Sequence, residues 1–176
     1  MKAVFLSDFD GTATALDFYK IVLNAIGPTG WDYVTEYRKT GKVDYHFLNR
    51  IFGWLDLTQE AYEGLLDTIE IDHTLSTLIR FLEAHQIDFS FVSAGFDRYI
   101  LDVLQRKGFG PLPLITNPGI FKGGRMKMLP DESSPFYSPV FGIDKGLVVA
   151  DFKKHYDLGT FISLIFKGSK RYSTCI

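Results

Sequence analysis

The sequence predicts an α/β fold in which a parallel sheet is covered by helices on both faces. Short apolar runs bounded by turn residues have the length and composition of buried strands. These runs are Ala3–Ser7, Ile87–Val92, Pro111–Ile115 and Phe161–Phe166. Segments with helical spacing lie between them, and strands that alternate with helices form parallel sheets. Ligands of such sheets bind beyond the carboxyl ends of the strands, so we expect the chemistry in the turns that follow them.

The segment 15–70, which follows the first predicted strand, is rich in aromatic residues and is predicted to be helical. Helical spacing is shown by Tyr19, Val22, Leu23 and Ile26. The breaks between short helices are predicted at Gly27-Pro28, Gly41 and Gly53. We expect a small helical cap over 15–70, inserted into a core domain made of 1–14 and 71–176. The cap aromatics, which we expect mainly to pack, are Trp31, Tyr33, Tyr37, Phe47, Phe52 and Trp54.

The remaining elements follow from stripes of apolar residues and from glycines. One helix is predicted over 72–85, with Asp72 or Thr74 at its N-terminus and an apolar stripe of Leu75, Leu78, Ile79 and Leu82. A second helix places Ile100, Leu101 and Leu104 on one face and ends at Gly108. Gly123-Gly124 indicates a hairpin turn, and 144–155 has the pattern of a last helix.

Composition excludes several classes of protein. The chain has 176 residues, of which 46% are apolar and 23% charged, as in a folded domain rather than a disordered chain. A net charge of −2 argues against nucleic acid as the main partner. No apolar run approaches the roughly 20 residues that span a membrane, and 1–7 is too short for a signal peptide. With Cys175 as the single cysteine, we expect a cytoplasmic protein without disulfides.

Three polar sites stand at predicted strand ends or helix starts. Asp8 and Asp10 follow the first strand and point to the same side of an extended chain, so one carboxylate can attack while the other carries a proton. Ser93, Ala94 and Gly95 lie where the second strand meets a helix, which predicts an anion pocket. The third site is Lys145, a cation placed against the dipole of a helix start. The alternative is that these residues have no catalytic role. The acids and the lysine would then be solvated, and Ser93 would cap the helix.

Asp8-Phe9-Asp10-Gly11-Thr12 resembles the first motif of the haloacid dehalogenase (HAD) superfamily of phosphatases and phosphotransferases. The resemblance implies a Rossmann-like core, Asp8 as the nucleophile that forms an aspartyl-phosphate, and Asp10 as general acid and then base. It also implies Mg²⁺ bound by the Asp8 carboxylate and the Asp10 backbone carbonyl. Ser93-Ala94-Gly95 resembles the second motif of the family, and Lys145 resembles the lysine of its third motif. The resemblance implies that these residues hold the phosphate together with Thr12.

Within the superfamily, the chain is most similar to phosphoserine phosphatase and the methionine-salvage phosphatase, which carry a helical cap between the first and second motifs. Asp17 lies where phosphoserine phosphatase has an acidic substrate residue, so we expect it to gate the substrate. Phe52 stands where that enzyme has the arginine that holds the serine carboxylate, with Arg50 two residues earlier. Phosphoserine is therefore not the expected substrate.

The pattern departs from the family after Asp157. The fourth motif, a Gly-Asp with a further Asp that completes the Mg²⁺ site, should follow Phe161–Phe166. Lys167-Gly168-Ser169-Lys170-Arg171 stands there, and no Asp or Glu occurs after Asp157. We hypothesise that a shifted reading frame or a truncation altered the chain from about Gly159, which sequencing of the locus would test. Mg²⁺ prefers carboxylate oxygens, so we expect weak Mg²⁺ binding and low turnover.

The leading hypothesis is a Mg²⁺-dependent phosphatase that hydrolyses a small phosphorylated metabolite. A phosphotransferase would differ only in the acceptor. The alternatives are a non-catalytic relative that binds phosphate, and an interaction module whose aromatic cap binds a protein partner. The sequence gives neither the substrate nor the oligomeric state.

Overall fold

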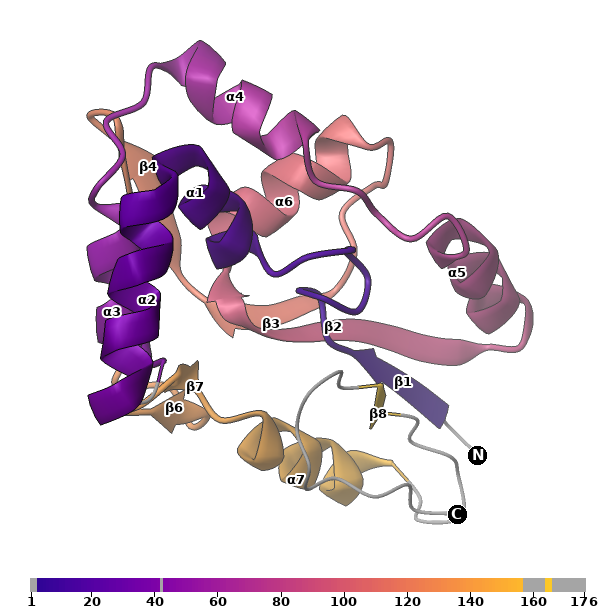
Figure 1. Cartoon of the computed structure of the whole chain (residues 1–176). Helices are drawn as coiled ribbons and strands as arrows, with labels where there is room; N and C mark the ends of the chain where they lie inside the picture. The colour runs from indigo at the N-terminus through magenta and orange to yellow at the C-terminus, as the bar shows by residue number, and fades with distance from the viewer. Residues whose placement is uncertain (1–2, 42, 157–163, 166–176) are drawn as a thin grey trace.

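A parallel sheet in the strand order β3-β2-β1-β8 forms the centre of the molecule. The computed structural model describes residues 3–41, 43–156 and 164–165. The strands are β1 (Ala3–Ser7), β2 (Ile87–Phe96), β3 (Leu114–Asn117) and β8 (Leu164–Ile165). Each neighbouring pair is parallel, with Ala3 opposite Ile87 and Ser7 opposite Phe91. The predicted α/β class with a parallel sheet is confirmed (Figure 1).

Helices cover both faces of this sheet, as the alternation of strands and helices predicted. On one face lie α5 (Leu75–Ala84) and α6 (Asp97–Arg106), and on the other lies α7 (Lys145–His155) (Figure 1). Neighbouring residues of a strand point to opposite faces. Phe91 accordingly joins the apolar cluster of α5 and α6, whereas Val92 packs with Val148 of α7. Both side chains are fully buried, so close packing on both faces fixes the position of β2 and of the residues at its carboxyl end.

The segment 15–70 is helical, as predicted. It contains α1 (Phe18–Ile26), α2 (Pro28–Thr40), α3 (Tyr45–Phe52) and α4 (Gln59–Asp67). The first three helices end at the glycines that indicated breaks, and Gly27 has a φ of +88° that suits glycine. Phe47 and Phe52 are buried, and the Tyr33 ring stacks on Phe47 with centroids 5.6 Å apart. Packing is thus the main role of these aromatics, although the side chain of Trp54 is 41% exposed.

A hairpin and a short two-stranded sheet lie between β3 and α7. The hairpin strands β4 (Gly119–Lys122) and β5 (Arg125–Met128) meet at the predicted Gly123-Gly124 turn, in which both glycines have positive φ. Asn49 of α3 joins the hairpin to the helical segment, because its side chain donates to the Met128 carbonyl at 2.9 Å and accepts from the Met128 amide at 2.7 Å. The short sheet contains β6 (Tyr137–Ser138) and β7 (Gly142–Ile143).

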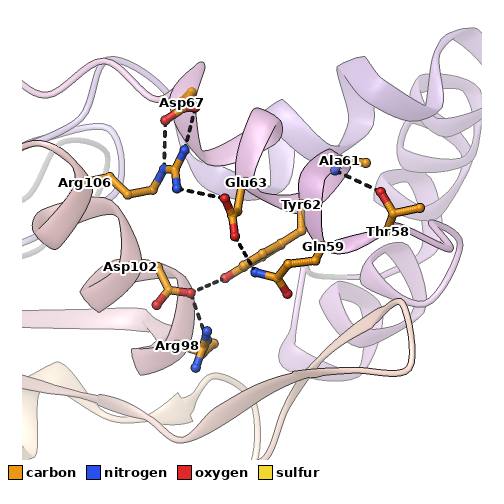
Figure 2. A network of polar contacts seen from close by, with 9 residues as sticks. All are labelled: Thr58, Gln59, Ala61, Tyr62, Glu63, Asp67, Arg98, Asp102 and Arg106. Atoms are coloured by element: carbon orange, nitrogen blue, oxygen red, sulfur yellow. Dashed lines mark hydrogen bonds and ion pairs between the residues drawn. The ribbon is translucent and has the colours of Figure 1, made fainter.

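A polar network attaches α4 to α6 (Figure 2). The buried Tyr62 donates its hydroxyl to Asp102 at 2.9 Å, and Arg98 contacts the same carboxylate at 2.8 Å. Arg106 forms two hydrogen bonds with Asp67, at 2.8 and 2.6 Å. The last helix of the segment 15–70 is therefore held against a helix that packs on the sheet. The division into a core domain and a cap domain stays a prediction.

Four sequence predictions need correction. Strand β2 continues to Phe96, so the expected turn at 93–95 belongs to the strand, and β3 begins at Leu114 rather than Pro111. Helix α5 begins at Leu75 rather than at residue 72, and of the two predicted caps Thr74 makes no side-chain hydrogen bond to it. Asp72 accepts a hydrogen bond from the Thr74 amide at 2.8 Å in the turn before the helix. The Leu101 side chain is 43% exposed, so it does not share the buried face of α6. The predicted strand Phe161–Phe166 is described only at Leu164–Ile165, and the residues after it, including the expected fourth-motif position, lie outside the described residues.

Candidate active site

Asp8 and Lys145 form an ion pair beyond the carboxyl end of β1. The Lys145 Nζ atom lies 2.7 Å from Asp8 Oδ2, and both side chains are largely buried. The other carboxylate oxygen, Oδ1, accepts a 2.8 Å hydrogen bond from the Phe9 amide. Burial raises the pKa of Asp8, and the Lys145 ammonium acts in the opposite direction. Lys145 begins α7, where Asp144 accepts hydrogen bonds from the Gly146 and Leu147 amides and fixes the start of the helix.

Asp10 lies deeper, and three donors surround its carboxylate. The Phe18 amide donates to Oδ1 at 3.0 Å, the Ser93 hydroxyl lies 3.4 Å from Oδ2, and the Tyr99 hydroxyl donates to Oδ2 in a short hydrogen bond. Burial raises the pKa of Asp10 to about 6, although the hydrogen bonds from Tyr99 and Phe18 lower it. A carboxyl group with such a pKa can exchange a proton near neutral pH.

Ser93 lies near the end of β2 and is fully buried. Its hydroxyl oxygen accepts a hydrogen bond from the Gly95 amide at 3.0 Å, so this amide is already engaged within the protein. Gly95 is also sterically required, since a Cβ atom there would lie 2.1 Å from the Tyr99 hydroxyl and 3.0 Å from Asp10 Oδ2. Of the predicted anion pocket, Ser93 thus contacts Asp10, and Gly95 contacts Ser93.

A cavity of about 230 Å³ is lined both by these residues and by residues of the helical segment 15–70. Among the predicted site residues, its walls include Asp8, Asp10, Asp17, Ser93, Ala94, Gly95 and Lys145. Thr12 is not among the residues that line it, and its hydroxyl is buried without a hydrogen-bond partner. Asp17 pairs with Lys20 at the start of α1. The apolar wall is made by Phe18, Val43, Leu48, Phe52, Met128 and Phe141.

Phe52 lines the cavity, as its position predicted, and Arg50 does not. The Arg50 side chain is exposed and donates to the Tyr33 hydroxyl at 2.6 Å. No arginine lines this cavity in the described part of the chain, so a substrate carboxylate would meet no guanidinium there.

Two more residues belong to the site: Tyr99, which the sequence did not single out, and Asn117, which its place after the third predicted strand had indicated without giving it a role. Nothing local in the sequence indicates the bond from Tyr99 to Asp10, which joins residues 89 positions apart. Asn117 ends β3, and its buried side-chain amide donates to the carbonyls of Ala94, Gly95 and Phe141 at 3.2, 3.0 and 3.1 Å. It therefore ties the end of β2 to the loop before α7. A polar residue at the end of a predicted parallel strand was the available signal.

Mg²⁺ is a hard cation that binds oxygen atoms, and the site offers such ligands. The Asp8 carboxylate and the Asp10 main-chain carbonyl are oxygen donors of the type that Mg²⁺ prefers, and Mg²⁺ is often bound by one or two carboxylates together with waters and substrate phosphate. In the described residues, however, no three His, Cys, Asp or Glu side chains come together to hold a metal. These residues thus fit Mg²⁺ by chemistry but supply an incomplete set of side-chain ligands.

Comparisons with known proteins agree with the motifs. The chain is 26% identical over 133 residues to the 2-hydroxy-3-keto-5-methylthiopentenyl-1-phosphate phosphatase of Lysinibacillus sphaericus, a match that covers 73% of this chain and 58% of that protein. A HAD family hydrolase from Salmonella enterica serovar Typhi superposes with a TM-score of 0.66 at 16% identity, over 92% of this chain and 56% of that chain. No family model matches.

A phosphoserine phosphatase from T. onnurineus also shares the fold, with a TM-score of 0.61 at 18% identity, over 93% of this chain and 74% of that one. The resemblance to HAD phosphatases is thus confirmed, and the chain has the Rossmann-like α/β fold of HAD hydrolases. It spans less than two thirds of the length of the Lysinibacillus and Salmonella proteins. No helix in the described ranges is long and apolar enough to cross a lipid bilayer.

Proposed function

We propose that this chain is a phosphatase that hydrolyses a small phosphate monoester through an aspartyl-phosphate on Asp8. The observation that carries the proposal is the 2.7 Å contact between Asp8 and Lys145 beside a cavity that Asp10 and Ser93 also line. The Lys145 ammonium favours the ionised form of Asp8 against the effect of burial, and the ionised form is the one that attacks phosphorus. The ammonium also offsets the negative charge that an incoming phosphate brings.

In the first step, an Asp8 carboxylate oxygen forms a bond to phosphorus while the bond from phosphorus to the ester oxygen breaks. The leaving oxygen takes the electron pair of that bond and a proton from the Asp10 carboxyl group. In the second step, the Asp10 carboxylate accepts a proton from water as the water oxygen attacks phosphorus and releases Asp8. Ser93, Ala94, Gly95 and Lys145, which line the cavity, are the proposed phosphate ligands, and Asp17 is the proposed gate. Thr12 was expected among the ligands, but it does not line the cavity, so a phosphate bound there would not reach its buried hydroxyl.

Mg²⁺ is part of the proposal, held by the Asp8 carboxylate and the Asp10 main-chain carbonyl. When bound, it would neutralise charge on the phosphoryl oxygens. We expect weak binding, because the Asp8 carboxylate is the one side-chain ligand of this set and no group of three His, Cys, Asp or Glu side chains gathers in the described residues. Titration of the protein with Mg²⁺ in a calorimeter, without substrate, measures this independently of turnover.

The cavity wall favours a substrate whose organic group is uncharged. Val43, Leu48, Phe52 and Met128 would surround that group, and a carboxylate among them would lack a partner. The Lysinibacillus relative is named for a phosphorylated methylthio compound, and we include this compound among the candidate substrates. We further propose that the helical segment 15–70 acts as a substrate-selecting cap and that the protein works in the cytoplasm.

The proposal is tested with a panel of metabolite phosphates and p-nitrophenyl phosphate, each with and without Mg²⁺. We expect slow release of phosphate by the wild type and none by Asp8→Asn. Glu83→Gln, a change at an exposed carboxylate outside the cavity, is the matched control and should keep full activity. Phosphate binding without release in every reaction would contradict the proposal and favour a non-catalytic relative.

A further inference from the structure

Tyr99 contacts Asp10 on the wall of the cavity. Its side chain is fully buried, and its hydroxyl donates to Asp10 Oδ2. Its ring stacks on Phe18 with centroids 4.1 Å apart and planes 10° from parallel, and it meets Phe96 edge-on at 4.8 Å. A ring packed on two sides has one rotamer available, so the hydroxyl cannot turn away from Asp10 without breaking this packing.

The neighbouring residues are arranged around the same contact. Phe18, on which the Tyr99 ring stacks, donates its amide to the other Asp10 oxygen at 3.0 Å. Gly95 leaves the space that the hydroxyl occupies, since a Cβ atom there would lie 2.1 Å from Tyr99 Oη. Three segments, from α1, β2 and α6, thus converge to hold one carboxyl group.

We infer that Tyr99 is the positioning residue of the general acid, which it holds in place and whose negative charge it stabilises as the proton leaves. The inference rests on the proposed function, because it assigns a role within that reaction. Hydrogen bonds to a charged acceptor are stronger than those to a neutral one. The Tyr99 hydroxyl therefore stabilises the Asp10 carboxylate that remains after proton transfer more than the carboxyl group before it. This difference lowers the barrier of the step in which the ester bond breaks.

The leaving group provides a readout that a structural role would not change. An alkoxide such as that of butyl phosphate leaves only when it is protonated, whereas p-nitrophenolate leaves as a stable anion. Tyr99→Phe keeps the stacked ring and removes the hydroxyl. We expect kcat for butyl phosphate to fall roughly 10- to 100-fold, the effect of one charge-assisted hydrogen bond, and kcat for p-nitrophenyl phosphate to change much less. KM should change little for either substrate.

Tyr62→Phe is the matched control. Tyr62 is also a buried tyrosine that donates to a carboxylate, Asp102 at 2.9 Å (Figure 2). Unlike Tyr99, it does not line the cavity. It should lose a similar amount of stability in urea unfolding and keep the wild-type ratio of the two reactions. Gly95→Ala is the second variant, since its methyl group would displace the Tyr99 hydroxyl. Both reactions should slow, because Gly95 also lines the cavity, but the ratio of butyl phosphate to p-nitrophenyl phosphate turnover should fall.

The outcomes separate the inference from the proposed function. Equal losses on the two substrates in Tyr99→Phe, or a selective loss in Tyr62→Phe, would overturn the role of Tyr99 while leaving the phosphatase intact. If Tyr99→Phe does not fold, the ratio measured for Gly95→Ala decides. A wild type that hydrolyses neither substrate would overturn the proposed function and this inference with it.

Discussion

Lys145 Nζ lies 2.7 Å from Asp8 Oδ2, so the first residue of α7 neutralises the carboxylate that follows β1. The pair joins the turn after β1 to the start of α7. Removal of the ammonium leaves a buried carboxylate without its cation, which raises the pKa of Asp8 further. It also removes the charge that would meet the phosphate.

We therefore predict that Lys145→Met lowers kcat/KM for p-nitrophenyl phosphate by about 100-fold or more, as loss of one preorganised charge does in other enzymes. The acidic limb of the pH–rate profile should move to higher pH, because Asp8 must be ionised to attack. Lys153→Met, at an exposed position of the same helix, is the control and should leave both quantities unchanged. Loss of less than threefold in Lys145→Met would contradict a role for this ion pair.

A second prediction concerns the energetic cost of Asp10. Its pKa is 3.8 in an ordinary environment and about 6 in the folded protein. Between these pH values the folded protein keeps a proton that the unfolded chain has lost, so stability falls as pH rises through this window. At a pH above 6, this difference in pKa lowers the free energy of unfolding by about 3 kcal/mol relative to its value below pH 3.8.

Asp10→Asn should consequently be more stable than the wild type at pH 8, by about 1–3 kcal/mol, and nearly equal to it at pH 4. Urea unfolding at both pH values measures the difference. Glu83→Gln, at an exposed carboxylate of α5, should show no such pH dependence. A destabilised Asp10→Asn at pH 8 would mean that the hydrogen bonds to the carboxylate outweigh its burial.

The sequence predicted the parts of the fold that local pattern determines. The run Ala3–Ser7 is bounded by an Asp-x-Asp-Gly turn, and the strand has those bounds in the structure. The hairpin turn at Gly123-Gly124 follows equally from local chemistry, because both positions require positive φ. Lys145 was identified mainly by its resemblance to the third-motif lysine, and the unfavourable place of a cation at a helix start was a weaker indication.

Other features depend on contacts between distant segments. Strand β2 extends to Phe96 because Phe96 pairs with Asn117 after a shift in register, and β3 supplies that partner. The exposed position of Leu101 depends on which face of α6 meets the sheet. The bond from Tyr99 to Asp10 links α6 to the end of β1, and only the assembled sheet brings these segments together. Periodicity along one segment could not predict these features.

A third prediction tests the apolar wall of the cavity. Phe141 lines the cavity although its side chain is 47% exposed, so its truncation should affect substrate more than folding. Phe141→Ala should raise KM for phenyl phosphate by about tenfold, with little change for methyl phosphate, which cannot reach the ring. Val140→Ala removes an exposed neighbour that does not line the cavity and should change neither value. A loss of kcat rather than KM would contradict a role in binding.

The last prediction concerns Asn117, whose amide group donates to three carbonyl oxygens from β2 and the loop before α7. Asn117→Ala should cost about 1–3 kcal/mol of unfolding free energy, because these buried carbonyls lose a donor. Asn117→Asp should cost more at pH 8, since a carboxylate would face the same oxygens, and part of the loss should return at low pH as the carboxyl group is protonated. Asn24→Ala, at an exposed residue bonded to Trp31, should change stability by about 0.5 kcal/mol or less. Urea unfolding of the four proteins gives the comparison, and equal stability of Asn117→Asp and the wild type at pH 8 would show that this junction does not hold the end of β2.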